Sequence, residues 1–255
     1  MSKCSRIMLA ACLLAVFSGC QQTGESQSHS QQDLTGIQQR DPGVWEETLK
    51  TDDFSQNFAI HVPQGYDAEV KAPLILALHY GGRVTPWYGK GFLEGLVQPA
   101  LAELNAIIVA PDSLGGSWDS DQNDQAVPEL LRQVREVYSI DESKTLVVGF
   151  SMGGHGAYYF AGNYPELFQA AIPMAARLSQ QVKQAEWKMP LHVVHSRKDS
   201  VVPFGPAEEY VKAEQAKGTQ IDFLVLEDLD HYNVPAYADS LKSLIPWIQE
   251  SWADP

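Results

Sequence analysis

The stretch TLVVGFSMGGHGAYYFAGNYP, residues 145–165, holds an apolar β-branched run, one serine between glycines, and then small and aromatic residues. The first run favours a buried strand and the remainder favours a helix. Gly149 and Gly153 stand two positions on either side of Ser151 in the pattern G-x-S-x-G. Glycines also mark ordinary turns. In a nucleophile turn, however, the serine is strained and a side chain two positions away would collide with neighbouring backbone. The stretch therefore predicts an exposed, reactive Ser151, provided that the rest of the chain supplies its partners.

The remainder of the chain alternates between strand and helix patterns. A length of 255 residues with 44% hydrophobic residues can bury one substantial core. Residues 57–62 alternate with a period of two, which predicts an antiparallel strand near one edge of a sheet. Other short apolar runs predict parallel strands that are buried on both faces. We expect one α/β domain over 44–255 with a doubly wound, mostly parallel sheet. Its further strands are expected at 73–79, 106–111, 145–150, 170–175, 190–196 and 222–227, and its helices at 92–105, 126–138, 152–163, 204–217 and 236–252.

The N-terminus has the pattern of a secretory signal. Lys3 and Arg6 precede an apolar run that is too short to span a bilayer as a helix. The segment ends in Phe-Ser-Gly-Cys and resembles a bacterial lipobox, which implies a signal peptide over 1–19 and lipidation of Cys20. Gln21 follows, and by the same resemblance its identity points to the outer membrane. The alternative is ordinary cleavage nearby, which would leave a secreted or periplasmic protein.

Residues 20–43 are rich in glutamine and serine, so we expect a lipidated N-terminus followed by a flexible linker. All three cysteines lie at or before Cys20, so the predicted domain has no disulfide and no thiol nucleophile. Removal of 1–19 leaves 16 basic and 32 acidic residues, a formal charge of −16. Such a surface disfavours nucleic acid and anionic lipid, so we expect membrane attachment through the N-terminal lipid only.

Two further side chains complete a candidate catalytic set. A serine nucleophile needs a base and an acid that orients the base. Asp199 follows the strand expected at 190–196, and His231 follows the last expected strand. The chain order Ser151, Asp199, His231 differs from the orders of the chymotrypsin and subtilisin proteases. The rival acids are less suited, because two precede the serine and one adjoins the histidine: Asp112, Asp119 and Asp230.

The segments LALHYGG, VVGFSMGGHG, HSRKDSVVP and LDHYN together resemble the α/β-hydrolase superfamily. Within it the chain looks most similar to carboxylesterases, feruloyl esterases and polyhydroxybutyrate depolymerases. The resemblance covers about residues 55–250 and implies the α/β-hydrolase fold. It also implies an oxyanion hole made by the amides of Gly81 and Met152. Tyr80 stands where the family usually has a glycine, so the Tyr80 amide is the alternative to the Gly81 amide as a donor.

The loop 111–124 is long and polar and is expected to shape a substrate pocket. Trp118 and Tyr232, together with Trp87, are candidates for an aromatic wall, although each could equally pack on the local surface. Only residues 176–189 separate two expected strands, so we expect one helix there and no large lid. The remaining histidines of interest are expected to be structural: His79, His155, His192 and His195.

The expected reaction is cleavage of a carboxylic ester through an acyl-enzyme, with a small-molecule or polymer-attached ester as substrate. No cofactor is implied, and no metal-binding or phosphate-loop pattern is present in the sequence. Two alternatives stay open at this point. One is a peptidase on the same fold, and the other is a non-catalytic binding lipoprotein on a hydrolase scaffold.

Overall fold

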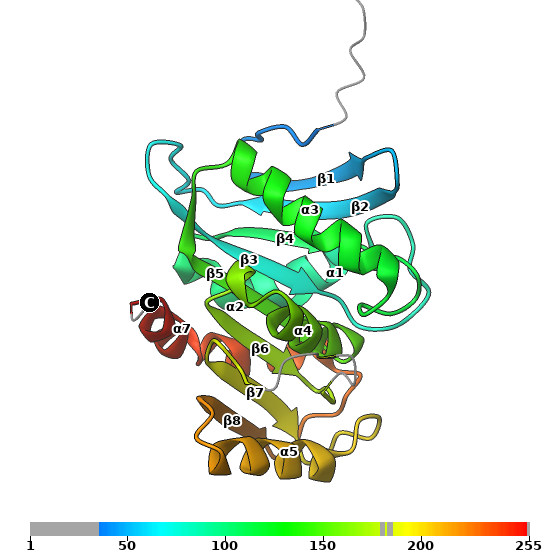
Figure 1. Cartoon of the computed structure of the whole chain (residues 1–255), viewed down its shortest axis with the longest axis vertical. Coiled ribbons are helices and arrows are strands. Elements are labelled where there is room, and N and C mark those ends of the chain that lie inside the picture. The colour runs from blue at the N-terminus through cyan, green and yellow to red at the C-terminus, as the bar shows by residue number, and fades with distance from the viewer. Residues whose placement is uncertain (1–35, 179–181, 183–185, 254–255) are drawn as a thin grey trace, which may run out of the picture. The chain divides into compact units, whose positions relative to one another are not determined.

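A computed structural model describes residues 36–178, 182 and 186–253. Within them, an eight-stranded sheet has the order β1-β2-β4-β3-β5-β6-β7-β8 (Figure 1). Its strands are β1 (Gly43–Lys50), β2 (Ser55–Val62), β3 (Ala72–Leu78), β4 (Ile107–Pro111), β5 (Ile140–Phe150), β6 (Ala170–Met174), β7 (Leu191–Ser196) and β8 (Ile221–Leu226). The main helices are α1 (Tyr88–Phe92), α2 (Gln98–Leu101), α3 (Asp121–Val137), α4 (Met152–Asn163), α5 (Phe204–Ala216), α6 (Ala238–Lys242) and α7 (Ile245–Ala253). Shorter turns of helix are the π-helical η1 (Leu93–Val97) and the 3₁₀ turns η2 (Ala102–Leu104), η3 (Pro165–Leu167) and η4 (Val234–Tyr237).

The strand directions explain how distant residues reach one place. β2 pairs antiparallel with both β1 and β4, and the strands from β4 to β8 pair in parallel. The predicted antiparallel strand near the edge is therefore confirmed, as is the doubly wound, mostly parallel sheet. Because parallel strands end at the same edge, the segments after β5, β7 and β8 all leave the sheet on one side.

Helices cover both faces of the sheet, and the alternation along β3 shows how. Leu74, Leu76 and Leu78 pack in one core cluster with residues of α3, α4 and α5. Ile75 and Ala77 point to the opposite face and pack with residues of α1, α2, α6 and α7. In Figure 1, α3 and α4 lie in front of the sheet. A strand buried on both faces must be apolar at every position, which is why β3 shows a continuous hydrophobic run.

Several element boundaries differ from the sequence prediction. No strand was expected at Gly43–Lys50, which forms the edge strand β1 with mixed exposure. Helix α3 begins five residues before the predicted position because the Ser120 hydroxyl accepts a hydrogen bond from the amide of Asn123 at 3.3 Å and caps it. The helix predicted over 236–252 is divided into η4, α6 and α7.

The end of the segment predicted as a flexible linker packs on the domain. The Arg40 amide donates to the Tyr138 hydroxyl at 3.0 Å, and the Ile37 amide donates to the Gln133 side chain at 3.4 Å. Ile37 and Arg40, within the segment predicted as a linker, thus contact helix α3 and the residue that follows it. The predicted signal peptide and Cys20 lie outside the described residues, as does part of the 176–189 connection. None of the helices in the described ranges is long and apolar enough to cross a membrane.

Candidate active site

Ser151 occupies the turn between β5 and α4 in a strained conformation, with φ 55° and ψ −116°. This is unusual for a residue with a side chain and marks a position that the surrounding structure must hold. The flanking glycines make the turn possible, because a Cβ at Gly149 would lie 2.0 Å from the Gly153 carbonyl oxygen. A Cβ at Gly153 would lie 1.8 Å from the Leu78 carbonyl oxygen. The predicted collision at both glycines is confirmed, and it leaves the hydroxyl at the start of α4.

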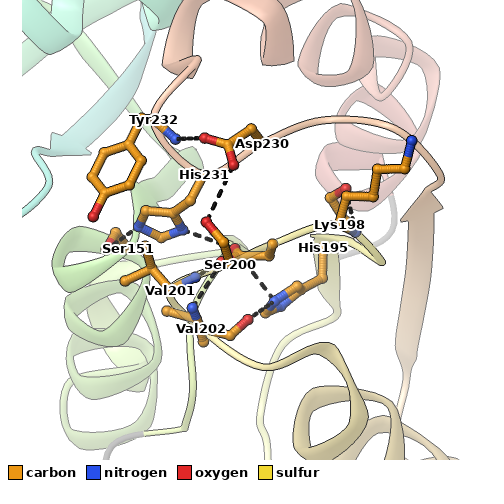
Figure 2. Close-up of polar contacts among 11 residues, drawn as sticks. Ser151, His195, Lys198, Ser200, Val201, Val202, Asp230, His231 and Tyr232 are labelled. Atoms are coloured by element: carbon orange, nitrogen blue, oxygen red, sulfur yellow. Dashed lines mark hydrogen bonds and ion pairs between the residues drawn. The ribbon is translucent and has the colours of Figure 1, made fainter.

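His231 contacts the Ser151 hydroxyl through one ring nitrogen (Figure 2) and the Asp199 carboxylate through the other. Its Nε2 is 2.9 Å from the Ser151 Oγ, and its Nδ1 is 2.8 Å from the Asp199 Oδ2. The histidine is 6% exposed, so the contact with the carboxylate is shielded from water. The three side chains that the sequence places after separate strands form one hydrogen-bonded chain. This geometry allows His231 to accept a proton from the serine while Asp199 orients the ring.

The surroundings of Asp199 keep its carboxyl ionised. Burial raises the pKa of Asp199, but hydrogen bonds from His231 and from the amides of Val202 and Val201 outweigh burial, so the pKa lies below its usual value. The two amides donate to Oδ1 at 2.7 Å and 2.9 Å, which leaves Oδ2 for His231. One carboxylate oxygen thus accepts from the backbone amides, and the other contacts the catalytic imidazole.

A second imidazole supports the loop that carries Asp199. The Nε2 of the buried His195 donates to the Val202 carbonyl at 2.9 Å and lies 3.5 Å from the Asp199 Oδ2. Burial lowers the pKa of His195, so the ring is neutral near neutral pH. The structural role of this histidine is to hold the Val202 carbonyl (Figure 2), and the amide of the same residue donates to Asp199.

The end of β3 lies beside the start of α4, where the oxyanion donors were predicted. A Cβ placed on Gly81 would be 3.8 Å from the Cβ of Met152, so these two residues are neighbours. His79 is buried below them: its Nδ1 donates to the Tyr80 carbonyl at 2.7 Å, and its Nε2 accepts from the Ser113 amide at 3.0 Å. Burial lowers the pKa of His79 to about 4, which keeps Nε2 available as an acceptor.

The two aromatic residues predicted to contact substrate differ sharply in exposure. Trp118 is fully buried, and its indole N–H donates to the His79 carbonyl at 2.9 Å. It therefore anchors the 111–124 loop to the end of β3 and does not line an accessible wall, which corrects the expectation. Tyr232 is 78% exposed, and its ring centroid lies 5.8 Å from that of His231 (Figure 2). Trp87 is partly buried and donates to the Glu47 carbonyl at 2.9 Å.

Each rival acid has other partners. Asp112 accepts from the Gly89 amide at 3.0 Å, and Asp119 pairs with His155 at 2.7 Å. Asp230 accepts from the Tyr232 amide at 2.9 Å and from the Ser200 hydroxyl at 3.2 Å, so it joins the two loops that carry Asp199 and His231 (Figure 2). Sequence reasoning missed this link because the hydrogen bond joins residues thirty positions apart.

The fold and this arrangement of serine, histidine and aspartate define an α/β-hydrolase. The chain belongs to the Esterase family, whose model matches residues 53–202.

Comparison with known proteins agrees with this assignment. The chain is 25% identical over 178 residues to feruloyl esterase C of Emericella nidulans, which covers 64% of this chain and 63% of that protein. The chain therefore spans less than two thirds of the length of that relative. The crystal structure of a thermostable esterase matches with a TM-score of 0.68 and 23% identity, over 81% of this chain and 62% of the other. The fluorophosphonate-binding serine hydrolase F of Staphylococcus aureus matches with a TM-score of 0.65 and 14% identity, over 82% and 99%. At these identities the two structures establish the fold.

Proposed function

We propose that the protein is a serine hydrolase that cleaves carboxylic esters through an acyl-enzyme. The observation that carries this proposal is the hydrogen-bonded chain from the Ser151 Oγ through His231 to Asp199. Membership of the Esterase family supports the ester as the bond that is cleaved. A protein that only bound ligands would have no need for a base within 2.9 Å of a strained serine.

In the proposed cycle, His231 takes the proton of Ser151 as the Oγ attacks the ester carbonyl carbon. The amides of Gly81 and Met152 donate to the oxyanion of the tetrahedral intermediate. His231 then gives its proton to the departing alcohol, which leaves an acyl group on Ser151. A water molecule hydrolyses the acyl-enzyme, again with His231 as the base, and the serine is restored.

The substrate that we propose is a small-molecule or polymer-attached carboxylic ester. The names of relatives point to aromatic acyl groups, since feruloyl esterase C is among them. Aryl-acyl esters, short alkyl-acyl esters and peptides are therefore the substrates to compare. Higher kcat/KM for peptides than for all of the esters would favour the peptidase alternative.

Labelling by a fluorophosphonate tests the nucleophile directly. Such a reagent reacts only with an activated hydroxyl, so we expect stoichiometric labelling of the wild-type protein at Ser151 and none of Ser151→Ala. Ester turnover by Ser151→Ala should fall by a factor on the order of 10⁶, as for a serine protease that has lost its nucleophile. Alanine fits the same space, so the variant should keep the wild-type melting temperature. Labelling at another residue, or turnover above a few per cent, would reject Ser151 as the nucleophile.

We further propose that the protein is a lipoprotein of the bacterial cell envelope, attached through Cys20 at the outer membrane. The lipobox-like end of the N-terminal segment supports this proposal. Metabolic labelling with a fatty-acid analogue should mark the wild-type chain and not Cys20→Ser. Recovery of unlabelled wild-type protein in the soluble fraction would instead support the secreted or periplasmic alternative.

A further inference from the structure

One face of α4 holds the loop between β4 and α3 beside the nucleophile. The Nε2 of His155 lies 2.7 Å from the Asp119 Oδ2, and one turn further along α4 the Tyr159 hydroxyl donates to the Asp124 Oδ1 at 2.6 Å. Between these contacts, Gly156 allows close approach, because a Cβ there would lie 2.6 Å from the Cβ of Trp118. The loop is thus held against α4 at Trp118 and Asp119, and the first turn of α3 is held at Asp124. One of these contacts is an imidazole–carboxylate pair that the proposed cycle does not use.

The chemistry of this pair determines which nitrogen of His155 carries a proton. Burial raises the pKa of Asp119, but hydrogen bonds from Ser117 and His155 outweigh burial, and the pKa lies below its usual value. An ionised carboxylate can only accept hydrogen bonds, so Nε2 of His155 must be the protonated nitrogen. In the neutral ring, Nδ1 therefore presents a lone pair and acts as an acceptor.

His155 lies on the same side of α4 as Ser151, because residues four positions apart share one face of a helix. His155 follows Ser151 by four residues, a rise of roughly 6 Å along the helix. Side chains of a helix lean toward its N-terminus, which here is the end that carries Ser151. The His155 side chain remains 28% exposed, and within the described part of the chain its Nδ1 has no hydrogen-bond partner and is not buried. Trp118, the neighbour of Asp119, is anchored to the end of β3 where Gly81 lies.

We propose that His155, oriented by Asp119, is a substrate-binding residue whose Nδ1 accepts a hydrogen bond from a hydroxyl group of the ester substrate. This inference rests on the proposed esterase function and narrows its substrates to esters that bear a hydroxyl group near the scissile bond. In this proposal His155 contacts the substrate in place of Trp118. Asp119, the residue after Trp118 in the same loop, orients the His155 ring.

Two pairs of probes test the inference, each pair differing in one methyl group. The first pair carries the hydroxyl on the acyl side: methyl para-hydroxyphenylacetate and methyl para-methoxyphenylacetate. The second pair carries it on the alcohol side: the monophenylacetate of ethylene glycol and the methyl ether of that ester. A methoxy oxygen cannot donate to Nδ1, so the ratio of kcat/KM within a pair measures the proposed hydrogen bond. We expect wild-type protein to favour the hydroxyl compound about fivefold to tenfold in one pair.

Three variants make the test specific. His155→Phe keeps a planar ring and removes the acceptor, so the ratio should fall to about 1. In Asp119→Asn the amide oxygen can keep the hydrogen bond from the Ser117 hydroxyl, so the NH₂ group faces Nε2, donates to it and moves the ring proton to Nδ1. Because hydroxyl and methoxy oxygens both accept from Nδ1–H, this variant should also lose the preference. Tyr159→Phe removes the neighbouring contact with Asp124 at the start of α3 but leaves the pair intact, so it should keep the wild-type ratio.

The outcomes separate this inference from the proposed function. Hydrolysis of all four esters by wild-type protein without a hydroxyl preference would overturn the inference and leave the esterase proposal standing. Failure to hydrolyse any ester would overturn the esterase proposal itself. A preference that survives in His155→Phe, or that is lost equally in Tyr159→Phe, would show that His155 does not receive the hydroxyl.

Discussion

At the scale of single residues, the two oxygens of Asp199 have different hydrogen-bond partners, which leads to a prediction for Asp199→Asn. Asparagine at this position can still accept from the amides of Val201 and Val202 through its oxygen. Its NH₂ group then faces His231 and can only donate, which forces the ring proton onto Nε2, where the serine needs an acceptor. Asp199→Asn should therefore lower kcat by about 10⁴ with an unchanged fold, as the same substitution does in a serine protease.

Asp230→Asn is the matched control for that measurement. Asp230 is the residue before His231 and is exposed, and its side chain contacts the Tyr232 amide and the Ser200 hydroxyl. Asparagine can keep its oxygen for the Tyr232 amide and donate its NH₂ to the Ser200 Oγ, so we expect a loss of less than about tenfold, consistent with two ordinary hydrogen bonds being weakened. Steady-state kinetics on one ester suffices for both variants. A greater loss in Asp230→Asn than in Asp199→Asn would reverse the assignment of the acid.

At the scale of elements, the β5–α4 turn depends on the two glycines more than on any side-chain contact. Gly149→Ala would place a methyl group 2.0 Å from the Gly153 carbonyl oxygen, and backbone cannot rotate away as a side chain can. We expect the free energy of unfolding to fall by at least about 2 kcal/mol, at the upper part of the range for overpacked cores. Ester turnover should fall as well, because the serine would move with the turn.

Gly205→Ala provides the control for this substitution. Gly205 lies in α5, and no atom outside its own helix segment lies within 4 Å of a Cβ placed there. Alanine favours helix over glycine by about 1 kcal/mol, so this variant should be neutral or more stable. Urea unfolding of both variants measures the difference. Equal stability of the two would show that the β5–α4 turn relaxes around the added methyl group without cost.

The elements also show where sequence patterns were sufficient and where they were not. β3 and α4 were predicted within a residue or two, because each pattern favours one type of element. A continuous apolar run indicates a buried strand, and the small and aromatic residues after Ser151 indicate a helix. β1 was missed, since an edge strand is covered on one side only and its pattern GVWEETLK is half polar. The start of α3 was placed too late, because DQND and the proline at Pro128 resemble a loop until the cap at Ser120 is seen.

At the scale of the whole molecule, buried histidines make stability depend on pH. The pKa of His79 in the folded protein is about 4, whereas an unfolded histidine titrates near 6.5. Between these values the unfolded chain binds more protons, so stability falls as the pH drops from about 6.5 to about 4. A difference of about 2.5 pKa units corresponds to roughly 3 kcal/mol at most from this one residue. Burial lowers the pKa of His61, His192 and His195 in the same direction.

Urea midpoints measured from about pH 7 to about pH 4 test this dependence. We expect a steady decline for wild-type protein and a shallower decline for His79→Gln, which lacks the titrating group even if its stability at neutral pH is lower. A pH dependence identical to that of wild-type protein would show that His79 is protonated in the folded state or accessible to water.

The short 176–189 connection leads to a further prediction for the whole protein. A connection of this length is expected to hold no large lid, so the initial rate on a sparingly soluble ester should saturate smoothly through the solubility limit of the substrate. The high negative charge also disfavours contact with anionic lipid surfaces. The rate against concentration is measured on a chain that starts after Cys20. A several-fold increase at the solubility limit would identify some other segment as a lid, with the 111–124 loop the first candidate.

The sequence by itself determined the alternation of strands and helices from β2 onward, the strained serine turn and the residue types of the site. These properties depend on local sterics and on apolar periodicity, which neighbouring residues specify. Only the tertiary structure decided that Trp118 is buried, that His195 supports the Asp199 loop and that His155 pairs with Asp119. Each of these depends on which side chains meet across elements far apart in the chain. A loop residue such as Trp118 has the same local pattern whether it faces solvent or packs against the end of β3, so its neighbours in space decide its role.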